Sequence, residues 1–89
     1  MKRKLFYEAI LKIETLEEAE NFFADIATDK EIDDFSDRLN VANKLLENKT
    51  YETITQETKI SSATIARINR AITYGKGGYK TILSRLKKD

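Results

Sequence analysis

The sequence predicts an all-α protein of six helices, and three observations support this fold class. Apolar residues recur at intervals of three and four, no proline interrupts them, and threonine or serine precedes several of the apolar stretches. All three glycines fall between residues 75 and 78, where they mark one sharp turn. The length suits one domain, so we expect a single domain over residues 1–89.

The first half of the chain predicts three helices. Residues 3–13 carry apolar side chains at helical spacing. Thr15 followed by Glu18, and Thr28 followed by Glu31, match the capping box that begins a helix. The helix after Thr28 is the longest, and one of its faces is acidic. Its apolar stripe consists of Ile32, Phe35, Leu39, Ala42, Leu45 and Leu46.

The second half predicts three shorter helices. Thr50 caps a helix over residues 51–58, and either Ser61 or Ser62 caps the next one, which runs to the glycine turn. The last helix covers about residues 79–87. We expect it to bury Ile82, Leu83 and Leu86.

Composition excludes several kinds of site. The chain contains no cysteine and no histidine, which removes disulfides and the commonest zinc ligand, so we expect no metal and no cofactor. No apolar run approaches the roughly 20 residues of a membrane span, and no apolar segment of a signal peptide follows the basic N-terminus. We therefore expect a cytoplasmic protein with no membrane partner.

So short a chain can form only a small core, and without disulfides or metals a second copy is the remaining means of enlarging it. Apolar stripes on several helices exceed what one chain can cover. We therefore expect a homodimer, with dimerisation helices at about residues 3–48 and 79–88 and the helix-turn-helix at about 50–74.

Charge is distributed unevenly along the chain. Residues 1–49 hold 8 basic and 12 acidic residues, a net charge of −4, whereas residues 50–89 hold 8 and 3, a net charge of +5. Between Lys59 and Lys88 there is no acidic residue. Positive charge concentrated in this way favours a polyanionic partner, most often nucleic acid.

A short helix, a tight turn and a second helix fit a helix-turn-helix, whose second helix enters the major groove of DNA. At 100° per residue, Ile65, Ile68 and Ile72 form the core side of that second helix. The opposite side, here called the outer face, consists of Ala63, Ala66, Arg67, Arg70 and Tyr74. The residues that we expect to contact double-stranded DNA are Lys59, Ser61, Ser62, Ala63, Thr64, Ala66, Arg67 and Arg70.

Two motifs carry a family resemblance. The segment Ser61-Ser62-Ala63-Thr64-Ile65 and the later Tyr74-Gly75-x-Gly77-Gly78-Tyr79 resemble the Trp repressor superfamily, and most closely its YerC/YecD-type proteins. The resemblance extends over about residues 16–86. It implies an intertwined, all-helical homodimer, and a transcriptional repressor that binds DNA through the helix beginning near Ser62.

The resemblance also bears on an effector. Arg38 and Arg67 match the two arginines that enclose tryptophan in the founding repressor, so they outline a vestigial effector pocket. Ile68 and Arg70 stand where that repressor has small residues, and they would crowd the ring. We therefore expect that L-tryptophan does not act as corepressor, and the sequence identifies no other effector. Arg38 also has an alternative role as an ion-pair partner of Asp34, one turn away.

Other functional classes are weaker. An enzyme is not expected, because no catalytic motif is present and the carboxylates lie mostly on exposed helix faces. The main alternative is a small adaptor of the transcription machinery that uses a helix-turn-helix fold to hold another protein. RNA binding is a third possibility, but Tyr74 and Tyr79 are expected to pack the glycine turn instead of stacking on bases.

Overall fold

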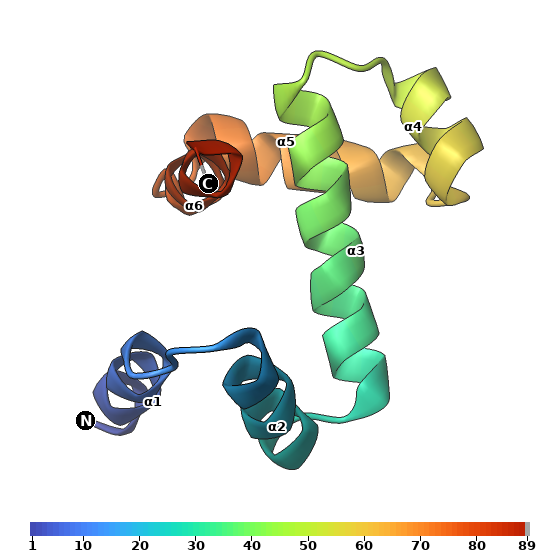
Figure 1. Ribbon diagram of the computed structural model, residues 1–89. Helices are drawn as coiled ribbons and strands as arrows, with labels where there is room; N and C mark the ends of the chain where they lie inside the picture. The colour runs from blue at the N-terminus through green and yellow to red at the C-terminus, as the bar shows by residue number, and fades with distance from the viewer. Residues whose placement is uncertain (89) are drawn as a thin grey trace. The chain divides into compact units, whose positions relative to one another are not determined.

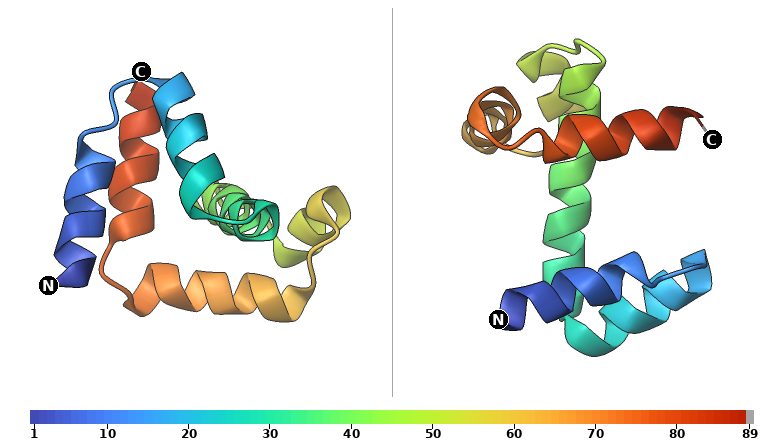
Figure 2. Two further views of the ribbon diagram at one scale, coloured as in Figure 1. Left: turned by 90° about the horizontal axis from the view of Figure 1, so that it is seen from below. Right: turned by 90° about the vertical axis from the view of Figure 1, so that its left-hand side faces the viewer.

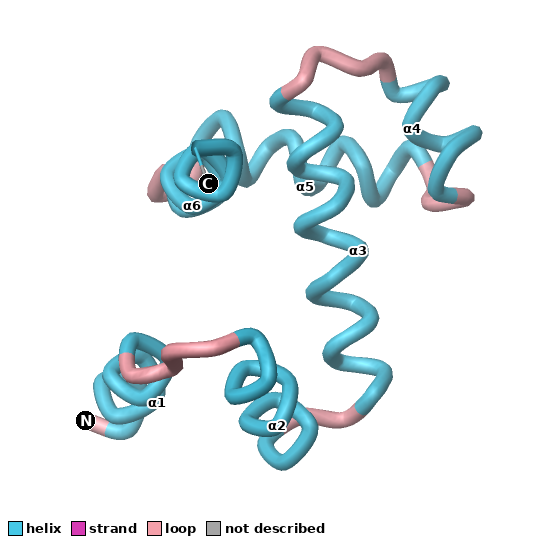
Figure 3. The backbone as a smooth tube through the Cα atoms, in the orientation of Figure 1, coloured by secondary structure: helices cyan, strands magenta, loops and turns pink. Residues whose placement is uncertain are grey.

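The computed structural model describes residues 1–88 and folds them into six α-helices joined by short loops, with no strand in that range (Figures 1 and 3). The all-α class and the six helices predicted from the sequence are confirmed. The helices are α1 (Lys2–Leu11), α2 (Leu16–Ile26), α3 (Asp29–Leu46), α4 (Tyr51–Thr58), α5 (Ser62–Tyr74) and α6 (Gly78–Lys88). None of them is long and apolar enough to cross a bilayer.

The chain divides into two compact units, Met1–Asp33 and the remainder from Asp34 onward. The first unit contains α1, α2 and the beginning of α3, and none of its residues is buried. Large apolar side chains are therefore exposed in it, including Leu5, Leu11 and Leu16, which are 72%, 80% and 78% exposed.

Both predicted capping boxes form, with one difference. Thr28 Oγ1 accepts from the backbone N–H of Glu31 at 3.1 Å, and a Glu31 carboxylate oxygen accepts from the N–H of Thr28 at 2.9 Å, so this box is complete. Thr15 likewise accepts from the N–H of Glu18 at 3.0 Å, but the Glu18 carboxylate accepts from Glu14, one residue earlier than expected. Helix starts can thus be predicted from these spacings.

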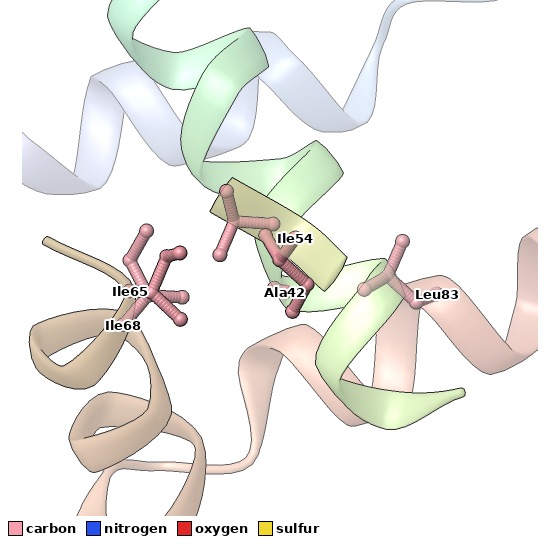
Figure 4. Packing of buried hydrophobic residues seen from close by; sticks show 6 residues of the cluster. Ala42, Ile54, Ile65, Ile68 and Leu83 are labelled. Atoms are coloured by element: carbon pink, nitrogen blue, oxygen red, sulfur yellow. The ribbon is translucent and has the colours of Figure 1, made fainter. Parts of the chain in front are cut away.

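The second unit holds the buried core, to which four helices contribute. Its members are Val41 and Ala42 of α3, Ile54 of α4, Ile65 and Ile68 of α5, and Leu83 of α6. Figure 4 shows five of them labelled, with Ile54 and Ala42 between the α5 residues and Leu83. Because α4 and α5 both place isoleucines in this cluster, burial fixes the helix-turn-helix onto α3.

The predicted burial of α6 is only partly correct. Leu83 is 5% exposed, but Ile82 and Leu86 are 50% and 57% exposed within the single chain. On α3 likewise, Phe35 and Leu39 remain 50% and 39% exposed. The apolar stripes of α3 and α6 therefore extend beyond the residues that the described part of the chain buries.

The turn between α4 and α5 depends on two local devices. Lys59 adopts a left-handed backbone conformation with φ of 65°, which ends α4. Ser61, not Ser62, then caps α5, because its hydroxyl accepts from the backbone N–H of Thr64 at 3.3 Å. Ser62 is the first residue of α5, so its side chain is left exposed at the helix start.

The glycine turn redirects the chain from α5 into α6, which leaves the line of α5 sharply (Figure 2). At Gly75 a side chain would collide with the carbonyl oxygen of Ala71, so this position requires the absence of Cβ. Gly77 has a φ of 81°, the left-handed region that glycine tolerates best. Gly78 has open space around it and begins α6.

Candidate nucleic-acid interface

The two sides of α5 differ sharply in exposure. Ile65 and Ile68 are 0% and 6% exposed, so they anchor the inner side of the helix in the core. The residues predicted to contact DNA lie elsewhere: Lys59, Ser61, Ser62, Ala63, Ala66, Arg67 and Arg70 are exposed, and Thr64 is half-buried. The helix-turn-helix therefore presents seven of these eight residues to solvent, on the turn and on α5.

Arg70 and Tyr74 form a pair on the outer face of α5. The guanidinium of Arg70 lies over the ring of Tyr74, with 5.4 Å between Cζ and the ring centroid. Tyr74 is 77% exposed, so the expectation that it packs the glycine turn is wrong. Tyr79, by contrast, is half-buried and packs against the core.

Arg38 and Arg67 line one pocket, as their match to the family pattern requires. The pocket has a volume of about 380 Å³ and lies between α3 and the start of α5. Its remaining lining residues are Asp34, Asp37, Ile60, Ser61, Thr64 and Ile68. Ile68 is thus part of the wall, but Arg70 is not, so the expectation that Arg70 crowds this pocket is not met.

The pocket differs from a slot for an aromatic amino acid in its charge. Two carboxylates, Asp34 and Asp37, share the wall with the two arginines. Arg38 lies over the ring of Phe35 at 5.6 Å, a contact within its own helix. The two carboxylates balance the charge of the two arginines, so the wall has no net positive charge to favour a ligand carboxylate.

An ion cluster joins α4 to α3. The Glu57 carboxylate lies 2.9 Å from Nζ of Lys44 and 3.3 Å from Nζ of Lys49. Hydrogen bonds from Lys44 and then Lys49 lower the pKa of Glu57, and the hydrogen bond with Glu57 raises the pKa of Lys44. The side chains of Lys44 and Glu57 are 19% and 42% exposed, so solvent screens the pair in part.

Sequence reasoning missed two features of this region. The stack of Arg70 on Tyr74 could have been found from their spacing, because residues four apart on a helix are neighbours. The ion cluster at Glu57 could not, since it depends on how α4 packs against α3. Within residues 1–88, no three His, Cys, Asp or Glu side chains gather in a way that could hold a metal ion.

The chain is all-helical, and the second helix of its helix-turn-helix, α5, exposes small and basic residues. These features are typical of helix-turn-helix regulators. The model of the Trp repressor protein family matches residues 2–87, and the chain therefore belongs to that family. The resemblance predicted from the two motifs is confirmed.

Three relatives agree with this membership. The uncharacterized protein YerC from Bacillus subtilis (strain 168) is 42% identical over 82 residues, which cover 92% of this chain and 79% of YerC. A TrpR-like protein from Eubacterium eligens has a crystal structure with a TM-score of 0.89 and 42% identity, covering 94% of this chain and 87% of that one. A crystal structure of a candidate Trp repressor from Staphylococcus aureus gives a TM-score of 0.91 and 39% identity, with coverage of 99% and 88%.

Proposed function

We propose that this protein is a homodimeric transcription regulator, acting as a repressor, that binds specific sites on double-stranded DNA through α5. The observation that carries the proposal is the outer face of α5, where small and basic side chains are exposed together. No acidic residue occurs between Lys59 and Lys88 to oppose a phosphate backbone.

The start of α5 suits the major groove. Ala63 and Ala66 project little from the helix, so the backbone can approach base edges closely. The exposed hydroxyl of Ser62 and the backbone N–H groups of the first turn can donate to phosphates. Arg67 and Arg70 follow one and two turns later, where guanidinium groups can bind phosphate or guanine.

Exposed apolar surface supports the homodimer. The first unit buries none of its residues, and in the second unit Phe35, Leu39, Ile82 and Leu86 remain at least 39% exposed. Covering these apolar side chains with a second copy of the chain lowers the free energy, because apolar surface is removed from water. Two copies of α5 related by a twofold axis would engage successive major grooves, so the DNA site should be a near-palindrome.

We propose that this regulator does not use L-tryptophan as corepressor and does not catalyse a reaction. Because the relatives are bacterial and bacterial DNA lies in the cytoplasm, the proposal places this protein there too. Arg38 and Arg67 are then the remains of an effector pocket, whose wall now holds two carboxylates.

Selection of bound sites from a random library of duplex DNA tests the proposal. The purified protein should enrich near-palindromic sequences whose half-sites lie about one helical turn apart. A variant with Arg67→Ala and Arg70→Ala, carried through the same selection, should enrich them weakly or not at all. Failure of the wild type to enrich any sequence, together with the formation of a mixed complex with another transcription protein, would favour the adaptor instead.

A further inference from the structure

We infer that Tyr74 is a positioning residue for DNA binding: it holds the guanidinium of Arg70 on the outer face of α5 so that Arg70 binds a DNA phosphate. This inference rests on the proposed function, and it adds a residue that the sequence did not assign to the interface. The inference is based on the contact between Arg70 and Tyr74, in which Cζ of Arg70 lies 5.4 Å from the centroid of the tyrosine ring.

The position of Arg70 along α5 favours phosphate over base edges. In a helix-turn-helix the N-terminal residues of the second helix contact the bases. Helix α5 begins at Ser62, so Arg70 lies more than two turns farther along. A side chain so far from the N-terminus of α5 meets the DNA phosphate backbone that borders the groove. Because Arg70 lies on the same face of α5 as Ala63, it is still directed toward the DNA.

The geometry of the stack leaves Arg70 able to bind. A cation–π contact uses the charge of the guanidinium and needs no hydrogen-bond acceptor, so the N–H donors of Arg70 remain for a phosphate in a bidentate arrangement. None of the carboxylates in residues 1–88 forms an ion pair with Arg70. The ring therefore restricts the side chain before DNA arrives, which lowers the cost of ordering it on binding.

The two arginines of α5 thereby acquire different roles. Arg67 lies in the wall of the pocket beside Asp34 and Asp37, whereas Arg70 projects from the outer face onto Tyr74. Tyr74 is 77% exposed in the single chain, so its ring adds little to the core that this chain buries.

Fluorescence anisotropy with the full-length protein and a labelled duplex of mixed sequence, at several salt concentrations, tests the inference. Tyr74→Ala and Tyr74→Leu should weaken binding by about two- to fivefold, whereas Tyr74→Phe, which keeps the ring, should bind like the wild type. Alanine and leucine favour helices more than tyrosine does, so these variants should keep α5 intact, as circular dichroism can verify.

A double-mutant cycle separates positioning from other effects. Arg70→Ala should reduce the slope of log K against log salt by about one unit. In that background Tyr74→Ala should cause no further loss, because the ring no longer has a guanidinium to hold. Lys2→Ala, which removes one exposed charge from α1, serves as a control and should change binding less than Arg70→Ala does.

Two results would overturn the inference, and they differ in what else they overturn. In the first, the wild type binds DNA, but either Tyr74→Leu binds equally well or Tyr74→Ala reduces the affinity as much in the Arg70→Ala background as in the wild type. Tyr74 then does not position Arg70, and the proposed function stands. If the wild type binds no duplex at any salt concentration, both the inference and the proposed function fail.

Discussion

The carboxylate of Glu57 lies 2.9 Å from Nζ of Lys44, so an ion pair joins the first helix of the helix-turn-helix to α3. Lys49 adds a second contact to the same carboxylate at 3.3 Å. Together with the burial of Ile54, this cluster sets where α4 lies, and α4 in turn determines where α5 begins.

The first prediction concerns pH. The pKa of Glu57 is lowered from 4.5, so its pair stabilises the fold above that pH, and the contribution is lost as pH falls through the lowered value. The pKa of Lys44 is raised from 10.5, so its contribution is lost only as pH rises through the raised value. Glu57→Gln should therefore be less stable than the wild type near neutral pH, and the difference should shrink in acid.

Urea denaturation at a series of pH values measures this difference. High salt should reduce it as well, because the pair is partly exposed. Glu20→Gln, at an exposed position of α2, is the matched control and should show a smaller difference at neutral pH. A difference for Glu57→Gln that stays constant from neutral pH into acid would refute the assignment.

The second prediction ranks the three glycines. Gly75→Ala places Cβ against the carbonyl oxygen of Ala71 and should cost about 1–3 kcal/mol of unfolding free energy. Gly77→Ala should cost about 1–2 kcal/mol, because its φ of 81° disfavours a side chain. Gly78→Ala has open space and should be neutral or stabilising by up to about 1 kcal/mol. Equal stability of the Gly75 and Gly78 variants would contradict the described turn.

The sequence predicted the helix ends well because local hydrogen bonds decide them. Thr50 caps α4, which spans Tyr51–Thr58 as expected, and both capping boxes lie where their spacing places them. The left-handed Lys59 could not be predicted, since lysine has no preference for that conformation and the following turn imposes it.

The site could be predicted only in part from the sequence, because tertiary contacts decide which side chains line a pocket. The family resemblance placed Arg67 with Arg38 in a pocket and expected Arg70 to crowd it, but the packing of α5 against α3 leaves Arg70 outside the pocket wall. Val41 is 0% exposed although it lies outside the predicted stripe of α3. A helical wheel gives directions around one helix, and the neighbouring helices decide which directions are buried.

The third prediction is that the folded protein is a dimer whose stability depends on its concentration. The midpoint of thermal unfolding should rise as protein concentration rises. Ile82 is 50% exposed in the single chain, and we expect the partner subunit to cover it. Ile82→Asp should therefore weaken the dimer, because it would bury a charge in the interface. Ser84→Asp, on the opposite side of α6, should weaken it less. A folded monomer of 10.3 kDa at micromolar concentration in sedimentation would exclude an obligate dimer.

The fourth prediction is that L-tryptophan does not bind as corepressor. Ile68 narrows the pocket, and Asp34 and Asp37 cancel the positive charge of the two arginines that would bind a ligand carboxylate. Overfilling a shaped apolar site costs about 1–3 kcal/mol, which weakens binding by roughly tenfold or more. Calorimetric titration should show no saturation at low micromolar L-tryptophan, with L-alanine as a control ligand. Saturable binding of one ligand per subunit that also tightens DNA binding would show that the pocket is functional.

The central claim is that α5 is the DNA-contacting surface, and the affinity for a selected duplex at near-physiological salt tests it most directly. The protein with both Arg67→Ala and Arg70→Ala should bind at least about tenfold more weakly than the wild type. A protein with Lys2→Ala and Arg3→Ala loses the same charge from α1 and should lose much less affinity. Equal affinity of the wild type and the α5 double variant would contradict the account.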